Sequence, residues 1–378
     1  MNFELSEEQL EVRALARKIL EDYCSNEQMR EFDHNERFNA KLWQELGTAG
    51  LLGIEIEQQY GGMSFDFETL CLVMEEVGRT VAPVPVLHAL AVAAHTVQRF
   101  GSEQLKKEVL PSVASGSEMI SCAFAEAGSY SLKPASLRAE ANDGGWVLNG
   151  EKSFVPFANR SKFLLVAAAT VDGLVLLVVD NKAAGLTMLE QTSTAGENQY
   201  CLQFSDCVVS NAYCLASGAE GFAVLQHVEN AAIAASVSQM VGVCEVMMRL
   251  TASYTSEREQ FGVKIATFQA VGQRAADCYI DVECLRLVAQ RAVYTVECGS
   301  NIEATEACAV AKIWAGDAGH RVSHAAQHLH GGMGVDREYS LWRYCLWAKQ
   351  LEHTFGNSAE HTERLGELLA KEFSAAAL

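Results

Sequence analysis

SEREQFGVKIATFQ, residues 256–269, lies between two long apolar helical patterns in a chain of 378 residues. The stretch gathers a cation, two aromatic rings, a glycine and an amide: Arg258, Phe261, Gly262, Phe268 and Gln269. An arginine can bind a phosphate through two hydrogen bonds, and a glycine lets a ligand approach the backbone closely. The pattern predicts a helix-to-helix junction that holds a ligand, whereas the plainer interpretation is a junction with a solvated surface arginine.

The composition favours a soluble protein of two or three domains. Hydrophobic residues make up 49% of the chain, enough to fill several cores. Lys and Arg number 29 against 48 Asp and Glu, giving a net charge of -19 without an acidic block. This balance argues against a nucleic-acid or anionic-membrane surface.

The cysteines and the first residues indicate a cytoplasmic protein. The chain begins MNFELSEEQL, which lacks the basic and apolar regions of a signal peptide. The most apolar segment, Phe163–Ala169 with its continuation Leu174–Val179, is broken by polar residues, so we expect no membrane span. Twelve irregularly spaced cysteines predict reduced, mostly buried thiols. His328 and His330 stand two apart without further ligands, so we expect no metal site.

Three segments of different texture follow one another along the chain. Residues 1–118 are predicted to be helical, with a capping box of Ser6 and Gln9 at the first helix. Its apolar stripe is formed by Leu10, Val12, Leu15, Ala16 and Ile19. Residues 119–215 alternate short β-rich runs with turns, and hairpins are predicted at Asp143–Gly145 and at Asn149–Gly150. This middle segment predicts a small antiparallel β-barrel or sandwich.

Residues 216–378 return to helical patterns rich in alanine. Four long helices are predicted: one that ends near Tyr254, then Ile265–Gly299, Glu303–Gly332, and a last one from Arg337 onward. Small residues along the apolar stripes are typical of closely packed antiparallel helices. The sequence therefore predicts a mainly α protein with a central β domain and a C-terminal four-helix bundle that carries the 256–269 stretch.

This order of domains resembles the acyl-CoA dehydrogenase family, and three motifs agree with it. NGEKSFVPFANRSKFLLVAA is similar to the family's NGxKxWITNxxxAD strand pair, REQFGxxxxxFQ to its cofactor arm, and HLHGGMGVDREYSLWR to its QxxGGxGYxxExPLxR segment. The likeness covers essentially the whole chain in the right order. It implies FAD-dependent α,β-desaturation of an acyl-CoA thioester, with a glutamate as base and an electron-transfer flavoprotein as acceptor.

The resemblance assigns the opening stretch to FAD bound mainly by an adjacent subunit. Arg258 would hold the pyrophosphate, Phe261 would pack on the adenine or ribose, and Gly262 would allow close approach. The turn Gly331–Gly332 would complete this half of the site, together with His328, which stands where the family usually has Gln. Phe268 and Gln269 belong to the same arm.

The flavin face of the middle domain departs from the family pattern. The family's Trp-Ile-Thr is replaced by Phe154-Val155-Pro156, and proline offers neither a hydroxyl nor an N–H. The family's TEPxAGSD becomes Ala125-Glu126-Ala127-Gly128-Ser129-Tyr130. Ser129 is the retained candidate for contact with the substrate.

Both positions of the family's catalytic glutamate hold uncharged residues. Phe355 or Gly356 occupies one position, and Ala232, followed by Ile233, occupies the other. Without a positioned base the chain loses about 100- to 10,000-fold in proton abstraction. Three nearby carboxylates are weak substitutes, each more simply a solvated charge: Glu229, Glu352 and Glu360.

A retained arm, an eroded flavin face and a missing base resemble one subunit of heterotetrameric α2β2 acyl-CoA dehydrogenases of steroid side-chain degradation. That subunit donates the arm, while its partner acyl-CoA dehydrogenase chain supplies the flavin pocket and the glutamate. Two alternatives stay open. The chain could be a self-sufficient homotetramer with a relocated glutamate, or a flavin-free scaffold that binds acyl-CoA.

Overall fold

The computed structural model describes residues 4–33, 36–129 and 132–376, and its N-terminal part is helical as predicted. The helices are α1 (Glu7–Tyr23), α2 (Asn26–Met29), α3 (Ala40–Thr48), α4 (Phe67–Thr80), α5 (His95–Phe100) and α6 (Glu103–Ala114), with a π-helix η4 (Leu87–Ala94) and short 3-10 turns η1 (Arg30–Asp33), η2 (Leu51–Gly53) and η3 (Gln58–Tyr60). The capping box of Ser6 and Gln9 is confirmed. Leu10 and Leu15, however, are 51% and 41% exposed, so the buried stripe of α1 is narrower than predicted.

The middle segment forms one eight-stranded sheet in the order β6-β7-β3-β2-β4-β5-β8, with β1 beside β4. The strands are β1 (Met119–Ala123), β2 (Arg138–Asn142), β3 (Gly145–Pro156), β4 (Ser161–Thr170), β5 (Gly173–Asp180), β6 (Leu186–Thr192), β7 (Asn198–Ser210) and β8 (Cys214–Ser217), with η5 (Asn211–Tyr213) before β8. Most pairs are antiparallel, as predicted, but β4 pairs in parallel with both β1 and β2.

One of the two predicted hairpins is confirmed and the other is wrong. Asp143 and Gly144 connect β2 to β3, with Asn142 paired to Gly145. Asn149 and Gly150 instead lie inside β3, where the register with β7 shifts. Gly150 has φ +130°, and a Cβ there would lie 2.5 Å from the Ser136 carbonyl oxygen. The glycine therefore marks a bulge rather than a turn.

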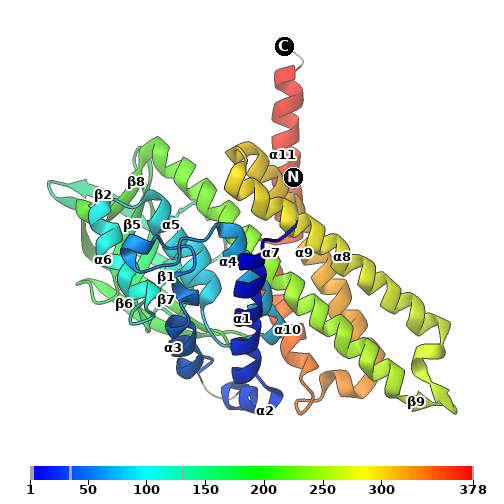
Figure 1. Ribbon diagram of the computed structural model, residues 1–378. Helices are drawn as coiled ribbons and strands as arrows, with labels where there is room; N and C mark the ends of the chain where they lie inside the picture. Colours follow the sequence, from blue (N-terminus) through cyan, green and yellow to red (C-terminus); the bar gives the residue numbers. More distant parts are fainter. Residues whose placement is uncertain (1–3, 34–35, 130–131, 377–378) are drawn as a thin grey trace.

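The C-terminal helices are α7 (Gly218–Glu257), α8 (Gln269–Cys298), α9 (Asn301–His330), α10 (Leu341–His353) and α11 (Ser358–Ala376), with 3-10 turns η6 (Ile265–Thr267) and η7 (Gly331–Val335). The predicted last helix is therefore two. Phe355 and Gly356 take φ +62° and +94°, which ends α10, and α11 then projects away from the bundle (Figure 1).

Helix α7 is the central element of the fold. It packs against α4, α8, α9 and α10, and its first turns contact β5. Among the described residues it is the one helix long and apolar enough to cross a membrane, a candidate that the sequence analysis missed, but 89% of its apolar window is buried inside the protein. All twelve cysteines are free, as predicted.

The crossing of α4 and α7 depends on two glycines. A Cβ on Gly78 would lie 2.0 Å from the carbonyl oxygen of Gln239, and a Cβ on Gly242 would lie 2.0 Å from that of Glu75. Backbone thus meets backbone at this crossing. The N-terminal helices are held at a fixed distance from the bundle, because no side chain separates them.

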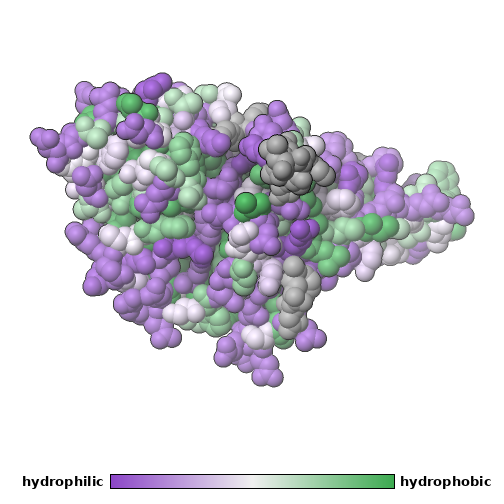
Figure 2. All heavy atoms as spheres, turned by 90° about the horizontal axis from the view of Figure 1, so that it is seen from above, coloured by the Kyte–Doolittle hydropathy of each residue, from purple (hydrophilic) through white to green (hydrophobic). Residues whose placement is uncertain are grey.

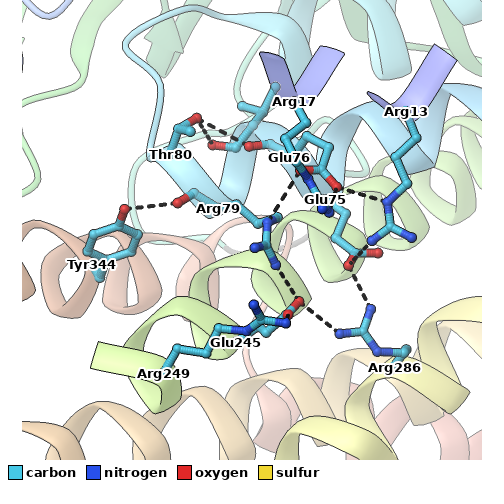
Figure 3. Close-up of polar contacts among 11 residues, drawn as sticks. Arg13, Arg17, Glu75, Glu76, Arg79, Thr80, Glu245, Arg249, Arg286 and Tyr344 are labelled. Carbon is cyan, nitrogen blue, oxygen red and sulfur yellow. Dashed lines mark hydrogen bonds and ion pairs between the residues drawn. The ribbon is translucent and has the colours of Figure 1, made fainter. Parts of the chain in front are cut away.

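Beside this crossing, buried carboxylates bind arginines from four helices (Figure 3). Glu76 of α4 accepts hydrogen bonds from Arg13 and Arg17 of α1. Glu245 of α7 pairs with Arg79 of α4 at 2.7 Å and with Arg286 of α8 at 3.0 Å. Because the carboxylates are buried and multiply paired, the network fixes the relative rotation of α1, α4, α7 and α8.

Replacing Gly242 by alanine is expected to destabilise the protein by about 2 kcal/mol or more, because the added methyl group would overlap backbone. Gly366 on the exposed face of α11 is the matched control, since a Cβ there meets nothing within 4 Å. Gly366→Ala should leave stability unchanged or raise it by up to about 1 kcal/mol. Urea unfolding measures both, and equal stability of the two variants would contradict the packing argument.

Acid should weaken the Glu245 contacts in a defined direction. Burial alone would raise the pKa of the Glu245 carboxyl, but the Arg79 hydrogen bond and the charges of Arg79 and Arg286 outweigh it and lower the pKa to about 2. The stabilisation is therefore complete above about pH 4.5 and is lost as the pH falls toward 2. Glu245→Gln should lower the free energy of unfolding at pH 7, and the difference from the parent should shrink between pH 4.5 and 2.5. A difference independent of pH would contradict this account.

Candidate functional site

The predicted ligand-holding junction is a β-hairpin at the end of α7. β9 (Glu259–Gln260) pairs with β10 (Val263–Lys264), and Phe261 and Gly262 form the two-residue turn. Both turn residues have positive φ, +55° and +79°, as a type I′ turn requires. Phe261 is strained in this conformation, and its ring is 92% exposed at the tip, in edge contact with Phe268.

Arg258 is the cation that the hairpin leaves available. Its backbone N–H caps α7 by donating to the Tyr254 carbonyl, and its carbonyl accepts from Ile265. Lys264 is neutralised by Glu259 at 2.8 Å, whereas the described part of the chain gives the Arg258 guanidinium no ion pair. The side chain is exposed and can therefore bind an anion supplied from outside.

The end of α9 lies beside the same junction. His328 accepts a hydrogen bond from Arg274 of α8 at 2.6 Å between Nδ1 and Nη1, which adds a second arginine that the sequence analysis did not single out. Gly331 and Gly332 are exposed, and a Cβ on either would meet nothing within 4 Å. The Gly331 N–H already donates to the His328 carbonyl, so this backbone amide is not available to a ligand.

An aromatic cluster packs between the ends of α7 and α9, beside this junction. The His330 ring stacks on Tyr254 with centroids 4.5 Å apart, and its Nε2 lies 3.2 Å from the Tyr339 hydroxyl. Burial lowers the pKa of His330. His330 is therefore a structural residue that joins the ends of α7 and α9, and Gln269 begins α8 at the same end.

The second candidate site is a cavity of about 750 Å³ between the sheet and α10. It brings together the positions that the sequence analysis assigned to the flavin face, the substrate contact and the missing base. Its lining includes Ala125, Glu126, Gly128, Ser129, Phe154, Pro156, Phe355 and Gly356. Tyr130 lies outside the described residues.

The edge of β3 offers this cavity few hydrogen-bond donors. The Phe154 N–H donates to Gln191 Oε1 at 2.7 Å, and Pro156 has no N–H. The Ser121 hydroxyl donates to the Pro156 carbonyl at 2.5 Å. Phe154 takes φ +55°, and its ring is half exposed. A flavin ring needs donors for its carbonyl oxygens and ring nitrogens, and neither Phe154 nor Pro156 of β3 has a free backbone N–H to supply one.

Glu126 is held in a structural role. Its carboxylate accepts a hydrogen bond from Lys152 at 2.7 Å and from the backbone N–H groups of Ala135, Ser136 and Leu137. Burial opposes the charge, but Lys152 and these amides lower the pKa of Glu126. A carboxylate satisfied in this way is a weak base and fixes the loop beside the cavity.

The positions of the family base are closed to a replacement carboxylate. A Cβ on Gly356 would lie 2.8 Å from His361 Nε2, and φ there is +94°. Phe355 packs its ring on His88 with centroids 5.7 Å apart. Ala232 and Ile233 are buried within α7.

The three carboxylates weighed as substitutes are engaged elsewhere. Glu229 forms a two-fold contact with Arg364, Glu352 pairs with Lys349, and Glu360 caps the start of α11 by accepting from Asn357 N–H at 3.1 Å. The described lining of the cavity contains none of these three residues. It does contain Glu197, with His88 and Cys122, which the sequence analysis missed.

The hairpin and the cavity lie far apart in one chain. Helix α7 has 40 residues and is therefore about 60 Å long. Its first turns contact β5, and its last residue precedes Arg258. Figure 1 shows β9 at the end of the bundle opposite the sheet, and Figure 2 shows this end as a narrow projection with hydrophobic and hydrophilic side chains exposed. No single ligand the size of a dinucleotide reaches both.

Comparison with known proteins shows to which family this fold belongs. The signatures of the acyl-CoA dehydrogenase N-terminal, middle and C-terminal domains match residues 6–117, 123–207 and 219–370. Acyl-CoA dehydrogenase FadE27 of Mycobacterium tuberculosis is 31% identical over 380 residues, 98% of this chain and 99% of the relative. The chain belongs to the acyl-CoA dehydrogenase family. Acyl-CoA dehydrogenases are flavoprotein oxidoreductases, so the hairpin and the cavity are the two places to compare with a flavin site.

Two solved structures resemble this acyl-CoA dehydrogenase over nearly its whole length. A variant of the Tcur3481-Tcur3483 steroid ACAD has a TM-score of 0.91 and 36% identity, covering 97% of this chain and 99% of the other. The ChsE4-ChsE5 complex from Mycobacterium tuberculosis has a TM-score of 0.90 and 32% identity, covering 98% and 99%.

Proposed function

We propose that this chain is the arm-donating subunit of a heteromeric, FAD-dependent acyl-CoA dehydrogenase. One observation carries the proposal. The exposed Arg258 and the exposed ring of Phe261 lie at the opposite end of α7 from a cavity whose β3 edge offers few donors and whose described lining has no carboxylate at the family's base positions. An FAD held by this arm must therefore rest its flavin on another chain.

The arm residues fit the adenine and diphosphate half of FAD. Arg258 would form charge-assisted hydrogen bonds to the diphosphate, and Phe261 would pack on the adenine or ribose. Gly262, Gly331 and Gly332 leave room for the cofactor to approach the backbone. Phe268, Gln269 and His328 would complete the contact. When bound, FAD supplies the hydride acceptor for α,β-desaturation of the acyl thioester.

The α-proton would be removed by a partner chain. Phe355 and Gly356 leave no carboxylate in the family position, and Gly356 cannot accept a side chain without moving His361. The partner would supply both the base and the flavin face. A self-sufficient homotetramer would instead need a relocated base. Glu229 and Glu352 are ion-paired outside the cavity, and the carboxylates that line it, Glu126 and Glu197, are already bound by Lys152 and by Gln199 and Gln350.

The relatives support a heteromer that acts on a bulky substrate. The ChsE4-ChsE5 structure is a complex, and the Tcur3481-Tcur3483 protein is described as a steroid ACAD. We extend both features to this chain, which would form a heteromer whose substrate is a steroid side-chain acyl-CoA. Its electron acceptor would be an electron-transfer flavoprotein, and its location the cytoplasm. Leaving half of the sites without flavin would free space in the others for a large acyl group.

Arg258→Ala is expected to weaken FAD binding to the heteromeric complex about ten- to one-hundred-fold, although this chain carries no base. A charge-assisted hydrogen bond to phosphate contributes about 1.5–3 kcal/mol. The measurement is the FAD retained by the co-purified complex after dialysis, read from flavin absorbance. Arg258→Lys should restore part of the retention.

Arg138 on β2 is the matched control, because it is an exposed arginine on the β domain. Arg138→Ala should retain FAD like the parent. Full retention by Arg258→Ala, with the complex intact on gel filtration, would show that the arm does not hold the cofactor.

A further inference from the structure

The cavity of this chain contains a group of three side chains that the arm-donating role does not use. Cys122 lies on β1, His88 on the π-helix η4, and Glu197 immediately before β7. All three line the cavity and are at least nine-tenths buried. Segments separated by 34 and 75 residues in the sequence thus place a thiol, an imidazole and a carboxylate together.

The imidazole lies between the other two groups. Cys122 Sγ lies 3.7 Å from His88 Nδ1, and His88 Nε2 lies 3.7 Å from Glu197 Oε1. The thiol and the carboxylate therefore face opposite nitrogens of one ring. This is the order of nucleophile, base and orienting group in covalent catalysis, in which unliganded distances are commonly longer than in the reacting complex.

The surrounding residues fix this orientation. Glu197 accepts hydrogen bonds from Gln199 at 2.8 Å and from Gln350 at 3.3 Å. The Phe355 ring packs against the His88 ring at a tilt of 56°. Phe355 is one of the two residues, with Gly356, assigned to the position of the missing base, and its ring supports the His88 imidazole.

Electrostatics in the cavity favour a proton on the imidazole. Burial alone would lower the pKa of His88, but its contacts with Cys122 and Glu197 outweigh burial and raise it to about 10. The other charged groups nearby are Arg37, which acts on Glu197, Lys349 and His353, which line the cavity, and Glu126, which lines it while paired with Lys152. A sulfur that faces a protonated imidazole is a better nucleophile than the sulfur of an ordinary cysteine.

We propose that Cys122 is a nucleophile for acyl thioesters that enter this cavity, with His88 as its proton acceptor and donor and Glu197 as a positioning residue. The lining beside the three groups is largely apolar, from Leu132, Phe154, Pro156, Leu346 and Phe355, and suits an acyl group. The expectation that this acyl group arrives as a CoA thioester rests on the proposed function.

The chemical step is a thioester exchange and needs no oxidant. The Cys122 thiol gives its proton to His88, its sulfur attacks the carbonyl carbon of the acyl-CoA, and a new carbon–sulfur bond forms. The bond from that carbon to the CoA sulfur breaks, and the departing CoA thiolate takes the proton held by His88. The products are an S-acylated Cys122 and free CoA.

The first test measures the reactivity of Cys122 in the full chain, alone and with its partner. Brief alkylation with iodoacetamide at pH 6.5 and at pH 8.5, followed by peptide mass spectrometry, compares Cys122 with Cys298, the exposed thiol. We expect Cys122 to react at least ten-fold faster than Cys298 at pH 6.5, although it is buried. His88→Gln should abolish this advantage, and Glu197→Gln should move the pH profile of Cys122 toward that of Cys298.

His353→Gln is the matched control, because His353 also lines the cavity but pairs with Glu352. It should leave the rate at Cys122 unchanged. A Cys122 in the parent protein that reacts no faster than Cys298 at pH 6.5 would overturn the proposal, whether or not the variants fold.

The second test uses octanoyl-CoA as the probe. The parent should gain an octanoyl group on Cys122 that hydroxylamine removes, with release of an equal amount of CoA, and Cys122→Ser should gain none at that position. Absence of the adduct on a reactive Cys122 would overturn the thioester assignment. Because Arg258→Ala leaves this cavity intact, loss of FAD from that variant and loss of acylation are independent results.

Discussion

The glycine-mediated crossing of α4 and α7 is the constraint on which the rest of the structure depends. Gly78 and Gly242 bring the two backbones into contact, and the buried pairs of Glu76 and Glu245 fix the rotation of the helices around that point. Helix α7 is thereby held as a rigid element about 60 Å long, from the sheet to the hairpin. Its length separates the hairpin from the cavity, and the proposed division of labour between chains rests on that separation.

The sequence predicted an element correctly where neighbouring residues alone determine its structure. The capping box at Ser6 and the turn at Asp143–Gly144 depend on neighbouring residues, and both are confirmed. The errors arise where tertiary contacts decide. Asn149–Gly150 has the composition of a turn, but strand β3 continues past it and its register with β7 shifts there. The break at Phe355 is hidden because an aromatic residue rarely takes positive φ.

The same distinction between local and tertiary determinants applies to the candidate site. The arm residues that the resemblance assigned, from Arg258 to Gln269, are close in the sequence, and their role stays a prediction. The hairpin geometry and the Arg274 contact of His328 could be seen only in the fold. Cys122, His88 and Glu197 come from three distant segments, and no spacing rule connects them. The available signal was a histidine in the apolar run PVPVLHALAV, where a buried polar residue requires partners.

We propose that this chain holds half of an FAD whose flavin lies on another chain. The most direct measurement is the FAD content of the chain expressed alone, compared with the chain co-expressed with the acyl-CoA dehydrogenase encoded nearest to it. If the cofactor is shared in this way, the protein should be colourless alone and the complex yellow, with about one FAD for every two chains. A yellow protein alone, with one FAD per chain and turnover of acyl-CoA, would contradict it.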